Sequence, residues 1–306
     1  MKIRFWGVRG SIPCPGPETV LYGGNTACIE LRFGEANRCV IIDAGSGIRA
    51  LGNMMMGQDL PKGPIKTEIF LTHTHWDHIM GFPFFTPIFI PGTEIDVYGP
   101  VTYEEEGLDQ IVGSQLSYRY FPVKHSELSA SIRYHPLKEC TLDLGDGISV
   151  TTKYLNHPIM CLGYRFEYEG KSFCTAYDTE PFRNVFPTDP DDPGYDETAA
   201  LEGETAAFEE NEKVLRFYRG ADILVHDSQY TQQEYETSKK NWGHSSFEWV
   251  VNAANKAGVK RVFFFHHDPL RSDKALESLL EEYREAIAGK TDMRLDLAQE
   301  GLEITL

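Results

Sequence analysis

The chain has 306 residues, in which 29 Lys and Arg stand against 46 Asp and Glu, and its formal net charge is −17. This length allows one large α/β domain or two small ones, and an apolar fraction of 41% allows a sizeable core. Proteins that grip long nucleic acid or an anionic membrane usually present a basic face, so the charge argues against both partners. A small anion stays open as a ligand, because bound metal ions can supply local positive charge.

The six cysteines are scattered and form no Cys-x-x-Cys pair. In a chain of this length the pattern indicates reduced, buried thiols and a cytoplasmic location, not a disulfide framework. Residues 1–10 start directly with a strand-like alternation, and no apolar run approaches about 18 residues. We therefore expect neither export nor membrane insertion. No motif encodes an oligomeric state, so a homodimer, the commonest oligomer, stays open.

The first half of the chain is dominated by strand patterns. Short apolar or alternating runs between turn signals predict strands over Lys2–Trp6, Thr26–Phe33, Cys39–Asp43, Glu68–Thr72 and Glu94–Tyr98. A helix is predicted over residues 46–56. The middle of the chain predicts a strand over 148–158 and a hairpin over 162–179, which turns at Glu169 and Gly170.

The last third alternates strands with helices. We predict strands over 221–228 and 259–265, helices over 245–258 and 272–289, and two short strands at the end. Ser245 and Glu248 form the sequence pattern of a capping box, and Gly258 is placed to end the same helix. No stretch reads as an interdomain linker, so we predict a single domain over 1–306.

One acidic segment, at about residues 181–215, stands apart from this pattern. Within it, residues 190–211 contain no Lys or Arg. The simpler interpretation is a solvated loop followed by a charged helix start. The alternative is an insertion that acts as a lid beside the active site.

The stretch from His73 to His78, "HTHWDH", crowds metal-binding side chains together after an apolar run. In extended chain, His73 and His75 point to the same side because the side-chain period is two. Asp77 and His78 come after the expected bend and can turn toward a second point nearby. Such an arrangement suits two adjacent cations better than one.

Further ligands are expected at strand ends, where the backbone is stiff. His157, Asp178 and His266 each follow a predicted strand. His267 is an alternative to His266, which we prefer because it directly follows the last apolar residue of its strand. Asp43 also ends a strand and is expected to orient ligand histidines instead of binding metal. An isolated residue of this kind is usually structural, and only the whole set argues for a metal site.

The sequence "HTHWDH" resembles the signature of the metallo-β-lactamase superfamily, and the separated residues follow in the order that this superfamily uses. The resemblance covers most of the chain and implies an α/β fold, the αββα four-layer sandwich, with metals at one edge of two sheets. It implies that one metal is held by His73, His75 and His157, and the other by Asp77, His78 and His266, with Asp178 bridging. Imidazole and carboxylate ligands suit Zn²⁺ and also accept Mn²⁺ or Fe²⁺.

A second stretch, "HDSQYTQQEYETSKKNWGHSSFEWV", resembles a motif of the ribonuclease Z branch, in which a histidine followed by Ser or Thr opens a helix beside the metals. Here this histidine is His244, with Ser245 as the helix cap. Asn25 and Thr26 resemble another element of that branch. The resemblance implies that His244 and Asp77 are the catalytic residues, with His244 protonating the leaving oxygen or stabilising phosphoryl charge. The alternative is that His244 only packs on Trp242.

These observations predict a dinuclear metal-dependent phosphodiesterase in which a metal-bridging hydroxide attacks a small cyclic or nucleotide phosphodiester. Ribonuclease Z enzymes carry a tRNA-binding arm between the third histidine motif and the bridging aspartate. Here only 20 residues separate His157 from Asp178, so the arm is missing and a long nucleic acid is an unlikely partner.

Other functions stay open. A lactone or thioester hydrolase would use the same dinuclear site without needing His244. A tRNA 3′-processing-like endonuclease and a non-catalytic cyclic-nucleotide sensor are further alternatives. Trp76 and the apolar residues 81–91 fit either a packed core or a wall of the substrate pocket.

Overall fold

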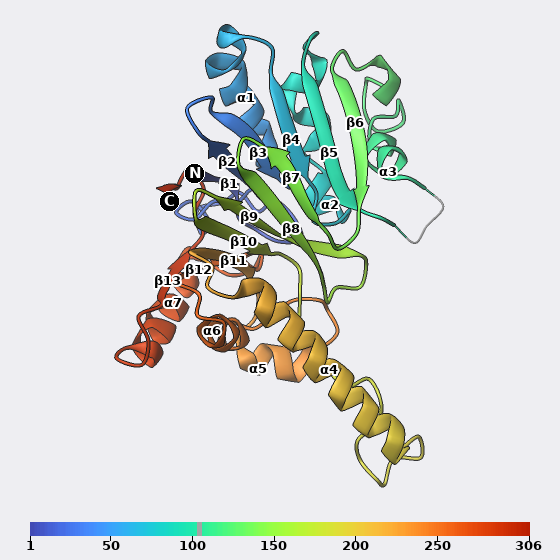
Figure 1. Cartoon of the computed structure of the whole chain (residues 1–306), viewed down its shortest axis with the longest axis vertical. Helices are drawn as coiled ribbons and strands as arrows, with labels where there is room; N and C mark the ends of the chain where they lie inside the picture. Colours follow the sequence, from blue (N-terminus) through green and yellow to red (C-terminus); the bar gives the residue numbers. More distant parts are fainter. Residues whose placement is uncertain (103–105) are drawn as a thin grey trace.

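The computed structural model describes residues 1–102 and 106–306, and within these ranges the chain forms two seven-stranded sheets that face each other (Figure 1). In spatial order, the first sheet consists of β14 (Glu303–Thr305), β1 (Lys2–Gly7), β2 (Cys28–Phe33), β3 (Arg38–Ile42), β4 (Lys66–Phe70), β5 (Glu94–Pro100) and β6 (Ser131–Leu137). The second sheet consists of β13 (Arg294–Leu297), β12 (Arg261–Phe265), β11 (Ile223–Asp227), β10 (Lys171–Ala176), β9 (Cys161–Tyr168), β8 (Ile148–Leu155) and β7 (Thr141–Gly145).

Helices cover the outer faces of the two sheets. The first sheet is covered by α1 (Ile48–Gln58), α2 (Trp76–Ile79) and α3 (Leu108–Ser114). The second sheet carries α4 (Glu197–Tyr218), α5 (Gln232–Glu234), α6 (Phe247–Lys256) and α7 (Asp273–Ile287) on its side of the molecule. None of the helices in the described ranges has both the length and the apolar character needed to cross a bilayer.

Three apolar layers hold the sandwich together. Between the sheets, Phe5 of β1 packs against Phe263 of β12 with ring centroids 5.4 Å apart. Leu51 of α1 is buried on the outside of the first sheet, and Val250 of α6 packs near Phe264 outside the second. Burial of such side chains is the main favourable contribution to folding. The predicted αββα sandwich is therefore confirmed.

The strand predictions held best where one face or both faces of a strand are buried. The hairpin between β9 and β10 turns at Glu169 and Gly170, whose φ values of 51° and 72° are those of a tight left-handed turn. We did not predict β6 and β7. Both are edge strands whose side chains are mostly exposed or half-buried. Leu142 and Leu144 of β7 alternate with polar residues and pack against the core, so this short alternation was a signal that we overlooked.

The predicted cap of α6 was wrong by one residue. Ser246 is the N-cap, and its Oγ accepts a hydrogen bond from the Trp249 amide at 3.2 Å. Ser245 instead donates its hydroxyl to the carbonyl oxygen of Thr179 at 2.5 Å. This bond ties the start of α6 to the loop after β10.

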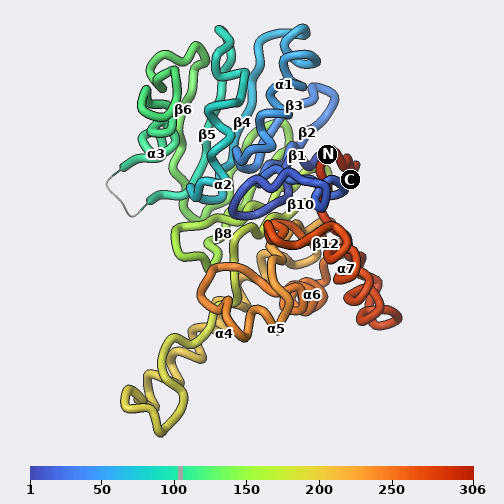
Figure 2. The backbone as a smooth tube through the Cα atoms, turned by 180° about the vertical axis from the view of Figure 1, so that it is seen from behind, coloured from blue at the N-terminus to red at the C-terminus, as the bar shows by residue number. Residues whose placement is uncertain are grey.

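The acidic segment forms an exposed loop followed by the 22-residue helix α4. The views in Figures 1 and 2 both show the loop and the outer part of α4 extending away from the two sheets. Its base is fixed by Asn211, whose side chain accepts from the Phe182 amide at 2.9 Å and donates to the Phe182 carbonyl at 2.8 Å. That this segment closes over the active site as a lid remains a prediction.

Candidate metal centre

The ends of several strands meet at one edge of the sandwich. The amide of Leu162 in β9 donates to the carbonyl of Thr72, just after β4, at 2.8 Å, so the two sheets are joined at this point. Asp43, Asp178 and His266 directly follow or nearly follow β3, β10 and β12, and their φ values of 61°, 45° and 59° lie in the left-handed region. Non-glycine residues adopt this conformation at a cost and are concentrated at functional sites.

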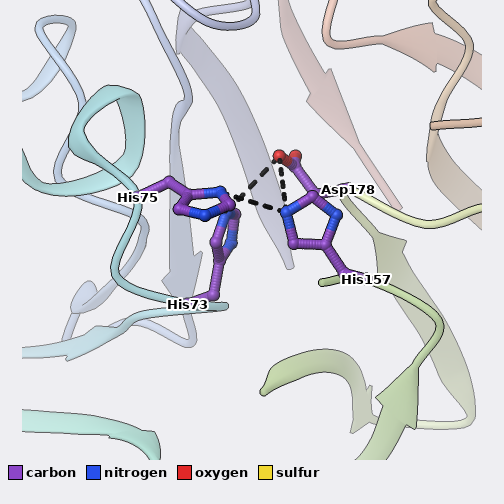
Figure 3. Close-up of side chains that lie close together, drawn as sticks. All are labelled: His73, His75, His157 and Asp178. Atoms are coloured by element: carbon purple, nitrogen blue, oxygen red, sulfur yellow. Dashed lines mark hydrogen bonds and ion pairs between the residues drawn. The ribbon is translucent and has the colours of Figure 1, made fainter. Parts of the chain in front are cut away.

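The three-histidine group consists of His73, His75, His157 and Asp178 (Figure 3). His75 Nδ1 lies 3.0 Å from both His73 Nε2 and His157 Nε2. Asp178 Oδ2 lies 3.4 Å from His73 Nε2 and 3.9 Å from His157 Nε2. Burial lowers the pKa of His73 and His75, and it lowers the pKa of His157 to about 4. These rings are therefore neutral at pH 7 and offer lone pairs to a cation.

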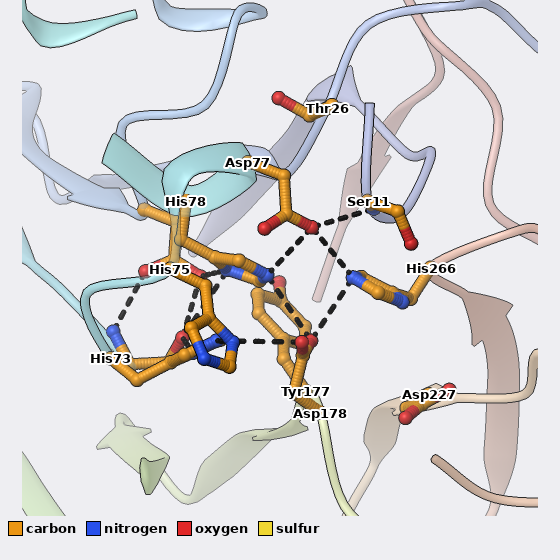
Figure 4. Close-up of polar contacts among 12 residues, drawn as sticks. Ser11, Thr26, His73, His75, Asp77, His78, Tyr177, Asp178, Asp227 and His266 are labelled. Carbon is orange, nitrogen blue, oxygen red and sulfur yellow. Dashed lines mark hydrogen bonds and ion pairs between the residues drawn. The ribbon is translucent and has the colours of Figure 1, made fainter. Parts of the chain in front are cut away.

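The two-aspartate group consists of Asp77, His78, Asp178 and His266, all of which are buried (Figure 4). His266 Nε2 lies 3.1 Å from Asp77 Oδ2 and 3.2 Å from Asp178 Oδ1. His78 Nε2 lies 3.4 Å and 3.2 Å from the same two oxygens. Asp178 belongs to both groups, which is the position that the resemblance implied for a bridging ligand.

The charges in the two-aspartate group oppose the effect of burial. Burial alone would raise the pKa of Asp77 and Asp178, but the neighbouring histidines hold both below the usual range. Burial alone would lower the pKa of His78, but the carboxylates of Asp178, Asp77 and Asp43 raise it. A proton on His78 thus balances buried negative charge, and a divalent cation would balance it in the same place.

Surrounding residues orient the ligand side chains. Asp43 Oδ2 lies 2.7 Å from His78 Nδ1, and the carboxylate also accepts from the Thr72 amide and hydroxyl at 2.7 Å and 2.8 Å. His78 Nδ1 therefore donates to Asp43, which leaves Nε2 to face the group. The orienting position expected for Asp43 is the one that the structure shows. On the other side, His157 Nδ1 donates to the Gly243 carbonyl at 3.0 Å.

Two buried atoms test whether these residues fit a cation. Within the described residues, His78 Nε2 and Asp178 Oδ1 have no hydrogen-bond partner. Buried polar atoms are nearly always satisfied, so two such atoms aimed at one point fit a missing cation better than a sealed core. The donor set of imidazoles and carboxylates fits divalent transition metals as well.

The structure distinguishes His266 from its neighbour. His267 is buried outside both groups, and its Nε2 donates to the Ala298 carbonyl at 2.9 Å. Burial lowers the pKa of His267 to about 3, so the ring stays neutral. Its backbone amide and carbonyl bond to Val8 and Gly10, which attaches the N-terminal loop to the end of β12. The structure thus places His266 among the candidate ligands and gives His267 a structural position.

His244 lies beside both groups and is not one of the metal ligands predicted from the sequence. Its ring stacks on His266 at 4.9 Å and lies 5.6 Å from His157. His244 Nδ1 donates to Asp227 Oδ2 at 2.8 Å. Burial would lower the pKa of His244, but the Asp227 carboxylate raises it to about 9. His244 therefore carries a proton at pH 7, and it contacts the site instead of only flanking Trp242.

Our sequence reasoning missed some residues of the site. Asp227 ends β11, and its position at a strand end was the available signal. Ser11 donates its amide to Asp77 Oδ2 at 2.7 Å, and no sequence pattern marked it. Gly10 lies so close to the site that a Cβ there would be 2.3 Å from the His266 ring. Trp76 is 76% exposed, which excludes the core position that we had left open for it.

Known proteins resemble this chain in sequence and in fold. The model of the beta-lactamase superfamily domain matches residues 38–188, which hold the first histidine cluster, His157 and Asp178. Residues 38–188 thus belong to a beta-lactamase superfamily domain. A ribonuclease Z of Lactococcus lactis subsp. cremoris is 27% identical to the chain, and the alignment covers 98% of this chain and 99% of the relative.

Solved structures of the superfamily share the fold along the whole chain. Yeast PDE1 superposes with a TM-score of 0.66 at 15% identity, covering 100% of this chain and 99% of that protein. Human short-form tRNase Z gives a TM-score of 0.61 at 18% identity, with coverage of 100% and 99%. These two structures show a shared fold. Together with the ribonuclease Z relative and the domain match, they support the ribonuclease Z-like branch and a metal-dependent hydrolase.

One expectation conflicts with these relatives. The name ribonuclease Z states that the Lactococcus protein acts on RNA, whereas we had expected a long nucleic acid to be an unlikely partner of this chain. In this chain, the residues between His157 and Asp178 form only the hairpin of β9 and β10. RNA therefore has to be tested as a substrate beside small phosphodiesters.

Proposed function

We propose that the chain is a phosphodiesterase that hydrolyses a small cyclic or nucleotide phosphodiester with two divalent metal ions. The observation that carries this proposal is the position of His244, which stacks on His266 and is hydrogen-bonded to Asp227. A thioester hydrolase on the same site would have little need of a protonated histidine there, because its thiolate leaving group is stable without a proton. A phosphodiester needs a proton for its leaving oxygen.

The metal ions would be held by the two groups, with Asp178 between them. Bound Zn²⁺, with Mn²⁺ or Fe²⁺ as alternatives, lowers the pKa of water to about 7 and stabilises charge on the phosphoryl oxygens. The neutral rings of His73, His75 and His157 supply nitrogen lone pairs at neutral pH. Asp77, whose Oδ2 is fixed by the Ser11 amide and by His266, supplies negative charge on the opposite side.

His244 is expected to act as the general acid. Its Nδ1 proton is held by Asp227, so the Nε2 proton is the one that can move to the leaving oxygen. Asp227 also stabilises the positive charge that keeps this proton in place at pH 7. After transfer, the neutral ring can take a proton from solvent, because its pKa of about 9 favours the charged form.

The size of the substrate is argued from charge and topology. A net charge of −17 opposes a polyanion, and the hairpin between His157 and Asp178 leaves no room for the expected tRNA arm. Against this, the relatives named ribonuclease Z and tRNase Z favour a tRNA 3′-processing-like endonuclease as the second candidate. Both candidates are phosphodiesterases and share the same chemical step.

The assignment can be tested with metal-loaded protein on a substrate panel. We expect hydrolysis of cyclic mononucleotides, cyclic dinucleotides or bis-p-nitrophenyl phosphate, and no comparable hydrolysis of lactones or thioesters. Precursor tRNA in the same panel separates the two candidates. If only precursor tRNA is cleaved, the endonuclease candidate replaces the phosphodiesterase for small substrates.

The variant His244→Ala tests the general acid. We expect it to keep both metals and to lose roughly 10²–10⁴-fold in kcat on the phosphodiester, which is the usual contribution of a positioned acid. His135→Ala is the matched control, because His135 lies on β6 and pairs with Asp96 outside the site. An unchanged rate in His244→Ala would end the phosphodiesterase assignment.

A further inference from the structure

An exposed tryptophan and a lysine lie together in the loop before α6. The Trp242 side chain is 56% exposed, and Lys239 Nζ lies 3.9 Å from the centroid of its ring. Within the described ranges, no carboxylate forms an ion pair with Lys239. In a chain with a net charge of −17, an unpaired ammonium group stacked on an open indole is an unusual local environment.

This pair lies at the rim of the candidate metal centre. Trp242 is followed by Gly243, whose carbonyl accepts from the predicted ligand His157 at 3.0 Å, and then by His244. Lys239 Nζ also lies 5.4 Å from the ring of Tyr230, and the Tyr230 ring lies 6.1 Å from the ring of His244. The ammonium group therefore sits between two aromatic rings, one of which contacts the expected general acid.

The loop that carries Trp242 is held rigidly against the site. The Glu180 carboxylate accepts from the Asn241 amide at 3.0 Å, from the Gly243 amide at 3.1 Å and from the Tyr235 hydroxyl at 2.9 Å. Glu180 lies two residues after Asp178, so the loop is attached to the same segment as the shared ligand. Gly243 has φ 79°, and a Cβ there would lie 2.3 Å from His157 Nδ1. The backbone on both sides of Trp242 is thus held in place beside the candidate ligand His157.

We propose that Trp242 and Lys239 form a subsite for the nucleoside part of a nucleotide phosphodiester. The flat base stacks on the open part of the indole, and Lys239 attracts the negative charge of the substrate. A substrate with a cationic headgroup does not fit, because the ammonium group of Lys239 already lies over the ring. This inference rests on the proposed phosphodiesterase function and narrows its substrate to diesters that carry a base.

Binding measurements can test the subsite without turnover. Calorimetric titration of the metal-loaded protein compares adenosine 5′-monophosphate with ribose 5-phosphate, which lacks the base. We expect the wild type to bind the nucleotide roughly tenfold more tightly, which is within the range for one stacked base. Trp242→Ala removes this preference and leaves the affinity for ribose 5-phosphate unchanged, while Trp242→Phe keeps part of it. Lys239→Ala weakens the binding of both ligands.

A matched control lies elsewhere on the surface. Lys124 Nζ lies 4.5 Å from the centroid of the Tyr118 ring, and Tyr118 is 60% exposed, so this pair copies the arrangement away from the metal groups. Tyr118→Ala should leave the preference for the nucleotide intact. Loss of the preference in Tyr118→Ala, or equal binding of the two ligands by the wild type, overturns the subsite.

The two proposals fail in different ways. If the wild type hydrolyses phosphodiesters but shows no preference for the base, the subsite is wrong and the proposed function stands. If it hydrolyses none of them and still shows a preference that depends on Trp242, the subsite stands and the proposed function is wrong.

Discussion

The two groups that share Asp178 are built from the same kinds of side chain but differ in burial and charge. In the three-histidine group, His75 is partly exposed, whereas the His157 side chain is only 2% exposed, and Asp178 is the single carboxylate. In the two-aspartate group every side chain is buried and a second carboxylate, Asp77, is present. One group opens to solvent and the other is closed off from it.

This difference in burial and charge indicates which group depends more on a bound cation for its charge balance. The histidines of the open group have lowered pKa values and are neutral without any metal. The closed group holds two carboxylates against burial and needs positive charge, which a proton on His78 supplies when no metal does. We therefore expect the two-aspartate group to bind its metal more tightly, and the three-histidine group to be the side that substrate and solvent reach.

The largest effect is expected from Asp178→Ala, because this residue belongs to both groups. Removing the shared carboxylate should release both metals and reduce turnover to background. Elemental analysis of the purified variant, together with activity after metal is added back, measures both effects. A variant that retains two metals per chain would show that the groups do not share Asp178 as a ligand.

Replacing each of two neighbouring histidines by alanine, in separate variants, tests the two-aspartate group alone. His266→Ala should lose one metal and most of the activity, since His266 contacts both carboxylates. His267→Ala should keep both metals and lose about 1–3 kcal/mol of folding stability, because it removes the buried hydrogen bond to Ala298. Metal content and urea unfolding separate the two variants, and the reverse pattern would make His267 the ligand.

Asp43→Asn tests whether the orienting residue acts on the closed group only. Asp43 contacts His78 directly. Its link to the three-histidine group is indirect and runs through the Thr72 hydroxyl, which lies near both Asp43 and His73. We expect a loss of about 10–100-fold in affinity for one metal, the usual effect of removing such a partner. Competition with a chelator measures it, and equal weakening of both metals would contradict the separation of the groups.

The smallest effect on metal binding is expected from a histidine outside both groups. His226 is buried, its Nδ1 donates to the Asp227 carbonyl at 2.7 Å, and burial lowers its pKa from 6.5 to about 4. Because the unfolded chain takes up this proton first, stability is complete above about pH 6.5 and falls by about 3 kcal/mol toward pH 4. His226→Gln should flatten this dependence and keep both metals.

Urea unfolding of the wild type and His226→Gln at about pH 7.5 and about pH 5 isolates this contribution, since the other titrating groups are common to both proteins. An equal loss of stability in both proteins on acidification would assign the pH dependence to other groups.

Much of the fold and of the candidate site was predictable, because it depends on short-range patterns. The "HTHWDH" stretch predicts metal ligands from local sequence alone, since extended chain places His73 and His75 on one side and a bend redirects Asp77 and His78. The buried strands were predicted for a similar reason, because their apolar runs are local. The edge strands β6 and β7 carry only a short alternation of half-buried and exposed side chains, which is a weaker signal.

The sequence by itself determined the kinds of ligand and their order, because residue type is a property of single segments, whereas the layered architecture was implied by the resemblance to the metallo-β-lactamase superfamily. Only the tertiary structure decided between His266 and His267, because a left-handed φ of 59° at His266 interrupts the alternation from which a side-chain direction could be predicted. It alone brought Asp227 to His244 and Trp242 to the rim of the site. Such contacts join segments that are distant in sequence, and their geometry is set by the packing of the two sheets.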